Sequence, residues 1–131
     1  LFNFTKNIYD NKKINIYGEG KHKRDFTYID DVVNGITACI NIKMKDKVPF
    51  KIYNLGRGKK RKLIDFIKLI EKYTNKKAKK SYLPLQSGDI YETSCDISKA
   101  QKELKYNPKT DIESGVKNFI KWFVDYYSIN S

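Results

Sequence analysis

The sequence has little cysteine, histidine or proline, and no apolar run long enough to cross a membrane. Cys39 and Cys95 do not form a CxxC pair, and His22 has no second histidine or cysteine near it in the sequence. We therefore expect no metal site, because structural zinc needs a set of Cys and His ligands. Both thiols are expected to be free and buried, which suits a cytoplasmic protein, and no membrane association is expected.

A glycine-rich dinucleotide-binding turn is also absent, since neither GxGxxG nor GxxGxxG follows a first strand. The spacing YxxxK, a catalytic tyrosine–lysine spacing in some NAD-dependent enzymes, occurs at Tyr9/Lys13, Tyr17/Lys21 and Tyr73/Lys77. With 10 tyrosines and 24 lysines among 131 residues, chance alone produces about as many such pairs. We expect no catalytic residue and no cofactor contact in this chain, because the motif needs a glycine-rich NAD-binding fold before it.

The net charge of +12 comes mainly from residues 57–80, which hold 11 Lys or Arg and 2 Asp or Glu. The chain has 24 lysines against 3 arginines, and it is rich in Ile, Asn and Tyr. These residue types share AT-rich codons, so a genome bias accounts for the lysines without an anionic partner. We expect no nucleic-acid binding, and a basic module that binds polyanions is the alternative from a different functional class.

The pattern of apolar residues predicts an α/β fold, a small mixed domain of short strands covered by helices. Helices are expected over residues 1–10, 29–40, 62–73, 96–105 and 112–127. Strands or extended segments are expected at residues 14–17, 25–29, 50–56 and 79–85, with 50–56 buried. No internal boundary is visible, so residues 1–131 form one domain.

Several polar groups have structural interpretations. Asp30 and Asp31 stand at the start of a predicted helix, where carboxylates interact well with the helix dipole, and this is favoured over a catalytic pair. The turn Gly56–Gly58 lacks the GK[ST] ending of a phosphate-binding loop, so an ordinary turn is favoured over an anion site. Thr110 and Glu113 have the spacing of a capping box before the last helix.

Four stretches of sequence carry a more specific signal: IYGEGKHKRDFTYIDDVVNGI at 16–36, YNLG at 53–56, LPLQSGDIYETSCDISKAQKEL at 83–104 and GVKNFIKWFVDYY at 115–127. In order and spacing they resemble the C-terminal part of extended short-chain dehydrogenases/reductases, the NAD-dependent epimerase/dehydratase family. They are most similar to the UDP-glucuronate 4-epimerase subgroup. Ser87 stands where that subgroup usually has proline, which leaves the loop less stiff.

The resemblance implies the C-terminal part of that fold, without most of the Rossmann domain. In the full-length enzyme it implies conversion of UDP-glucuronate to UDP-galacturonate with bound NAD, for polysaccharide biosynthesis, and a homodimer. The N-terminal NAD-binding domain is expected to lie outside this chain, and the chain alone is expected to be inactive. Another UDP-sugar epimerase, a decarboxylase or a dehydratase is the alternative.

The same resemblance implies four substrate-binding residues. Arg24 is expected to contact the diphosphate, because a guanidinium gives charge-assisted, often bidentate bonds to phosphate oxygens. Asp89 is expected to accept hydrogen bonds from the ribose, and Gln86 to donate to phosphate or sugar. Tyr17 is expected either to line the uracil pocket or to pack in the core. The three loop residues Arg24, Gln86 and Asp89 are expected to face one open side.

Overall fold

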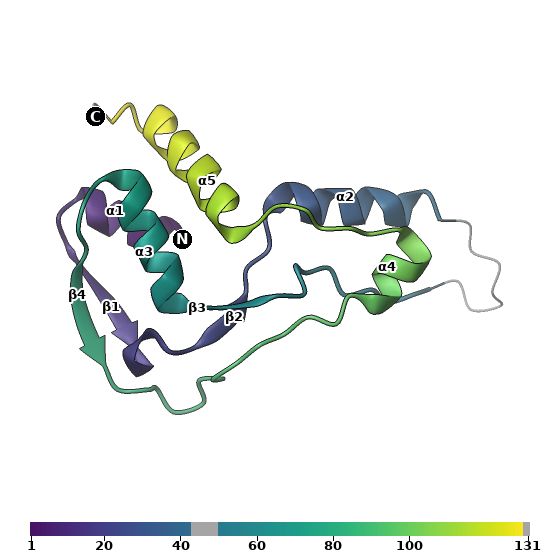
Figure 1. Cartoon of the computed structure of the whole chain (residues 1–131), viewed down its shortest axis with the longest axis horizontal. Helices are drawn as coiled ribbons and strands as arrows, with labels where there is room; N and C mark the ends of the chain where they lie inside the picture. Colours follow the sequence, from purple (N-terminus) through teal and green to yellow (C-terminus); the bar gives the residue numbers. More distant parts are fainter. Residues whose placement is uncertain (43–49, 130–131) are drawn as a thin grey trace.

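The computed structural model describes residues 1–42 and 50–129 and confirms a small mixed α/β fold (Figure 1). Its elements are α1 (Phe2–Tyr9), β1 (Lys13–Tyr17), η1 (Gly18–Gly20), β2 (Lys23–Asp25), α2 (Ile29–Ile40), β3 (Lys60–Lys62), α3 (Leu63–Thr74), β4 (Lys79–Leu83), α4 (Ser98–Leu104) and α5 (Ile112–Tyr126). The five expected helices and the strands near 14–17 and 79–85 are present. The extended piece expected at 25–29 lies earlier in the chain, as β2. The strand β3 was not expected, and residues 50–56 do not form a strand.

The strands form two separate pairs. β1 lies parallel to β4, with the register running from Lys13 opposite Lys79 to Tyr17 opposite Leu83. β2 lies antiparallel to β3, with Arg24 opposite Arg61 at the centre of the ribbon. Figure 1 shows the β2–β3 ribbon between two groups of helices, α1, α3 and α5 on one side and α2 and α4 on the other.

The first group, with β1 and β4, forms what we call the closed region. Residues alternate along β1 so that Ile14 and Ile16 are buried, while α3 contributes Ile67 and Ile70 at helical spacing. α5 packs against α3 and adds further apolar residues to this core. The buried residues of the core are Ile8, Ile14, Ile16, Phe66, Ile67, Ile70, Val116 and Ile120. The elements of the closed region therefore bury its central residues, although Trp122 and Tyr126 on α5 stay exposed.

The second group, α2, residues 50–58 and α4, forms what we call the open region. Its buried core is small and consists of Ile97, Ala100, Leu104 and Tyr106. α2 approaches it closely at Gly35, where an added Cβ would lie 2.7 Å from the Leu55 side chain and 3.1 Å from the Tyr106 ring. A larger residue at position 35 would push the helix away from this core.

Much of the apolar surface of the open region is exposed. The predicted apolar face of α2 is present, but Ile29, Val33, Ile36 and Ile40 are 62%, 48%, 51% and 78% exposed. The expectation of a buried strand at 50–56 is wrong, since Phe50 and Ile52 are 67% and 73% exposed. The physical reason is that no other strand among the described residues pairs with this segment.

The cap of α5 also differs from the expected one. Asp111, rather than Thr110, is the N-cap, and its carboxylate accepts a hydrogen bond from the Ser114 amide at 2.7 Å. Glu113 instead accepts a hydrogen bond from the Tyr73 hydroxyl and forms an ion pair with Lys72. The predicted capping box is therefore wrong by one residue, because either Thr or Asp can cap a helix and the spacing alone did not separate them.

Candidate substrate-binding site

Arg24 lies at the centre of the β2–β3 ribbon and is half-buried. Its Nη1 donates to the carbonyl oxygen of Lys23 at 2.9 Å and, at 3.4 Å, to that of Tyr91. The guanidinium forms no ion pair with a carboxylate anywhere in residues 1–42 and 50–129. Arg24 therefore forms no ion pair with the neighbouring Asp25, and its positive charge is available to an anion.

The segment that carries Gln86 and Asp89 runs beside β2. The Lys23 amide donates to the Tyr91 carbonyl at 3.1 Å, and the Thr93 amide donates to the Lys23 carbonyl at 3.1 Å. Before this contact the chain makes a tight turn, in which the Asp89 amide donates to the Gln86 carbonyl at 3.1 Å. The structure thus brings Arg24 against the end of the same loop that holds these two residues.

The side chains of Gln86 and Asp89 are exposed, and neither is engaged by another described residue. Tyr17 is half-buried at the end of β1 and pairs with Leu83, where β4 leads into this loop. A hollow of about 460 Å³ opens beside that point, lined by Gly18, Glu19, Lys21 and residues 82–85, without Tyr17 or Gln86. A common nucleotide site for these residues stays a prediction.

Asp25 has a role that the sequence did not reveal. Its carboxylate accepts hydrogen bonds from the amides of Arg57 at 3.0 Å and Gly58 at 2.8 Å. These are the amides that a phosphate at this turn would need, and a carboxylate already occupies them. The preference for an ordinary turn over an anion site at Gly56–Gly58 is therefore supported. Neither residue type nor spacing linked Asp25 to a turn more than thirty residues away.

The two carboxylates at the start of α2 differ from each other. Asp31 is 5% exposed and accepts hydrogen bonds from the amides of Lys109 and Thr110, each at 3.0 Å. Asp30 is exposed, and the N-cap residue Tyr28 makes no capping bond through its side chain. Asp31 is therefore structural, as expected, but it holds a distant loop instead of capping its own helix.

Glu92 pairs with two lysines on one face of the β2–β3 ribbon. Its carboxylate forms ion pairs with Lys23, at 3.1 Å, and with Lys60. The hydrogen bonds from Lys60 and Lys23 lower the pKa of Glu92 below its ordinary value. Lys60 belongs to the lysine-rich segment 57–80, and two more lysines of that segment, Lys72 and Lys80, pair with carboxylates of this chain.

Cys39 and Cys95 are free thiols and are half-buried. Burial raises the pKa of the Cys95 thiol, and the nearby carboxylates of Asp25 and Asp96 raise it further, so this thiol is not activated as a nucleophile. Within residues 1–42 and 50–129 no group of three His, Cys, Asp or Glu residues could hold a metal ion. No helix in that part of the chain is long and apolar enough to span a membrane.

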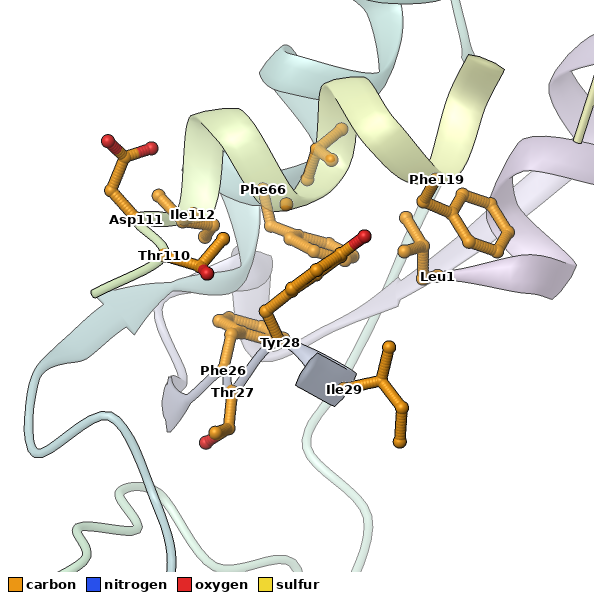
Figure 2. Close-up of a pocket in the computed structure, with 12 residues that line it drawn as sticks. Leu1, Phe26, Thr27, Tyr28, Ile29, Phe66, Thr110, Asp111, Ile112 and Phe119 are labelled. Atoms are coloured by element: carbon orange, nitrogen blue, oxygen red, sulfur yellow. The ribbon is translucent and has the colours of Figure 1, made fainter. Parts of the chain in front are cut away.

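A separate cavity of about 320 Å³ lies between the end of β2 and α5, and Figure 2 shows its lining. The rings of Phe26 and Phe66 stack on one side of it, with their centroids 4.4 Å apart. The Tyr28 ring reaches across toward Leu1 and Phe119. None of the four predicted substrate-binding residues lines this cavity. Its apolar lining makes it a poor site for a diphosphate, which needs hydrogen-bond donors.

Comparison with known proteins identifies a family and several relatives. A model of the GDP-mannose 4,6-dehydratase family matches residues 1–119. An uncharacterised protein of Methanocaldococcus jannaschii is 51% identical over 124 residues, which are 95% of this chain and 37% of that protein. A UDP-glucuronate 4-epimerase of Thermodesulfobacterium geofontis is 41% identical over 123 residues, which are 93% of this chain and 36% of that enzyme.

Among solved structures, a UDP-glucuronic acid 4-epimerase of Bacillus cereus in complex with UDP-glucuronic acid and NAD superposes with a TM-score of 0.79. It is 32% identical in sequence, over 92% of this chain and 38% of that one. This chain therefore spans less than two fifths of the length of each of these three proteins.

Proposed function

Because the chain belongs to the nucleotide-sugar epimerases and dehydratases of the extended short-chain dehydrogenase/reductase family, we propose that it is the substrate-binding part of a UDP-glucuronate 4-epimerase. The observation that carries this proposal is its similarity, over nearly its whole length, to a structure that holds UDP-glucuronic acid. The proposed reaction of the full-length enzyme inverts C4 of UDP-glucuronate with bound NAD.

In this proposal Arg24 binds the diphosphate. Its charge has no carboxylate partner among the described residues, so an arriving phosphate does not have to displace an internal acid. Asp89 and Gln86 lie exposed on the adjoining loop, where Asp89 would accept hydrogen bonds from ribose hydroxyls and Gln86 would donate to phosphate or sugar. Tyr17 contributes at most an edge of the uracil pocket, since its side chain is half-buried at a strand end.

Among the described residues, the turn Gly56–Gly58 is a poor site for the pyrophosphate of NAD. The two-glycine turn at Gly56–Gly58 could in principle approach a pyrophosphate, but its amides are held by Asp25. We therefore assign no cofactor contact to this chain, and no step of the reaction is placed on its residues. Their proposed work is to bind and orient the nucleotide-sugar.

The exposed apolar face of α2, made of Ile29, Val33, Ile36 and Ile40, is proposed to pack against the cofactor-binding part of the same protein. Phe50 and Ile52 are further exposed apolar side chains of the open region. The matched relatives are more than twice as long as this chain. Their remaining length is enough for a cofactor-binding part that would cover this apolar face. Covering such a surface is favourable at roughly 25 cal/mol per Å² of apolar area.

The test of the substrate-binding role is calorimetric titration of the chain with UDP-glucuronate at fixed ionic strength. We expect Arg24→Lys, which keeps the charge but loses the guanidinium fork, to weaken binding by about ten- to a hundredfold. Lys59→Gln, in the same basic segment, should change the affinity by less than about twofold, because exposed charges are screened. If Arg24→Lys leaves the affinity for UDP-glucuronate unchanged while Lys59→Gln lowers it, the assignment of Arg24 to the diphosphate is wrong.

A second experiment tests whether the chain binds substrate without catalysing the reaction. Incubated with UDP-glucuronate and NAD, the chain should form no UDP-galacturonate above background, because it holds neither a glycine-rich turn nor an assigned catalytic tyrosine–lysine pair. Turnover by the chain alone would overturn the proposal that it is a substrate-binding part.

A further inference from the structure

The β2–β3 ribbon places two arginines directly opposite each other. Arg24 of β2 and Arg61 of β3 are partners in the antiparallel register. Opposite residues of an antiparallel pair project to the same face of the ribbon, with Cβ atoms roughly 5 Å apart. The chain has only 3 arginines against 24 lysines. Two of these arginines therefore stand side by side on one face of a ribbon whose strands are three residues long.

On the other face of the ribbon two lysines have a carboxylate partner, whereas on this face neither arginine has one among the described residues. Lys23 and Lys60 share the carboxylate of Glu92. Neither Arg24 nor Arg61 forms an ion pair within residues 1–42 and 50–129, and Arg61 is exposed and makes no hydrogen bond there through its side chain. Like charges directly opposite each other destabilise a strand pair, so the free ribbon carries a repulsion that a bound anion would relieve.

We propose that Arg61 is a second phosphate-binding residue, which acts with Arg24 on the diphosphate of the nucleotide-sugar. This inference rests on the proposed function, because it assigns Arg61 to the same site. A diphosphate offers two neighbouring anionic groups, and two planar guanidinium groups on one face provide a matching pair of hydrogen-bond forks. The backbone ladder between β2 and β3 fixes the spacing of the pair before the ligand arrives.

Lys62 provides a matched control. It follows Arg61 in the same strand, carries the same charge and is also exposed, but it projects to the opposite face of the ribbon. Nonspecific attraction of an anion to the basic segment would depend on both residues alike. A site made by the arginine pair would depend on Arg61 alone.

The experiment measures the affinity of the chain for UDP, UDP-glucuronate, UMP and inorganic pyrophosphate at one ionic strength. The variants are the wild type, Arg61→Gln, Lys62→Gln and Arg24→Gln. We expect Arg61→Gln to weaken UDP and pyrophosphate binding by about tenfold, the loss of one charge-assisted hydrogen bond. The loss for UMP should be smaller, since one phosphate can be held by Arg24 alone. Lys62→Gln should change each affinity by less than about twofold.

Other outcomes separate this inference from the proposed function. If Arg61→Gln and Lys62→Gln lower the affinity equally, anions bind the general positive charge and the arginine-pair site is wrong. The arginine-pair site is also wrong if the wild type does not bind UDP. A loss in Arg24→Gln with none in Arg61→Gln would overturn the pair and leave the proposed function standing. If Arg61→Gln acts as expected but UDP-glucuronate binds no more tightly than pyrophosphate, the pair stands and the nucleotide-sugar function fails.

Discussion

The closed and open regions contain similar apolar residues but use them differently. In the closed region Ile14, Ile16, Ile67 and Ile70 are at most 1% exposed. In the open region Ile36 and Ile40, which recur at the same helical spacing, are 51% and 78% exposed. An apolar face on a helix therefore shows that the helix is amphipathic, and whether the face is buried depends on what packs against it.

Polar contacts hold the open region where its core is small. The Tyr106 hydroxyl donates to the Gly56 carbonyl at 2.9 Å, and the Tyr53 hydroxyl donates to Glu103 at 2.7 Å. Asp31 fixes the loop that leads to α5. Because hydrogen bonds contribute only about 1 kcal/mol each, we expect the open region to unfold locally before the closed region does.

The largest expected difference comes from the same substitution made in each region. Ile67→Ala should lower the free energy of unfolding by about 2–5 kcal/mol, because it leaves a cavity in a closed core. Ile36→Ala on α2 should change it by no more than about 0.5 kcal/mol, because the side chain is already half in water. Urea unfolding followed by circular dichroism measures both. Equal losses would show that the apolar face of α2 is covered in solution.

The next effect concerns the carboxylates of α2. Asp31→Asn should lower the free energy of unfolding by about 1.5–3 kcal/mol, since the Lys109 and Thr110 amides bond different oxygens of the carboxylate and Asn replaces one of these acceptors with an NH2 donor. Asp30→Asn, one residue earlier and exposed, is the control and should stay within about 0.5 kcal/mol. If the two variants lose the same amount, Asp31 acts through the helix dipole and not through the loop.

The smallest effect concerns Glu71, the buried carboxylate of the closed region. Burial acts to raise the pKa of Glu71, but hydrogen bonds from Lys80 and the Ala78 amide outweigh it, and the net result is a lowered pKa. A lowered pKa in the folded state stabilises the protein above the ordinary glutamate pKa, and this stabilisation is lost as pH falls through the folded-state value.

Glu71→Gln should therefore cost about 1 kcal/mol at neutral pH and progressively less below about pH 4.3. Unfolding of the wild type and the variant across this pH range gives the difference directly. A difference that grows as the pH falls would mean that burial, not hydrogen bonding, dominates the pKa of Glu71.

Local features of the fold could be predicted because they depend on neighbours in the sequence. The helix over residues 62–73 followed from apolar residues at helical spacing, and the break after β1 followed from Gly18 and Gly20, both of which have positive φ. The family followed from strings such as RDFTYIDD and LPLQSGD, which resemble the motifs of the family, and the family model matches residues 1–119.

Long-range features could not be predicted in this way. Asp25 and Asp31 each hold the amides of a loop that is distant in sequence, and no local pattern distinguishes them from Asp30 or Asp89. The pairing of Arg24 with Arg61 is of the same kind, since strand register is set where two segments meet in space.

The sequence by itself determined the helices and the family, because periodicity and motif spacing are properties of short stretches of chain. It also pointed to Arg24 as the phosphate-binding residue through the family resemblance, and that role stays a prediction. The tertiary structure alone decided which apolar faces are buried, which carboxylates hold loops, and which arginine stands beside Arg24. The physical reason is that burial, backbone hydrogen bonds and charge pairing depend on distances between segments, and those distances exist only after the chain has folded.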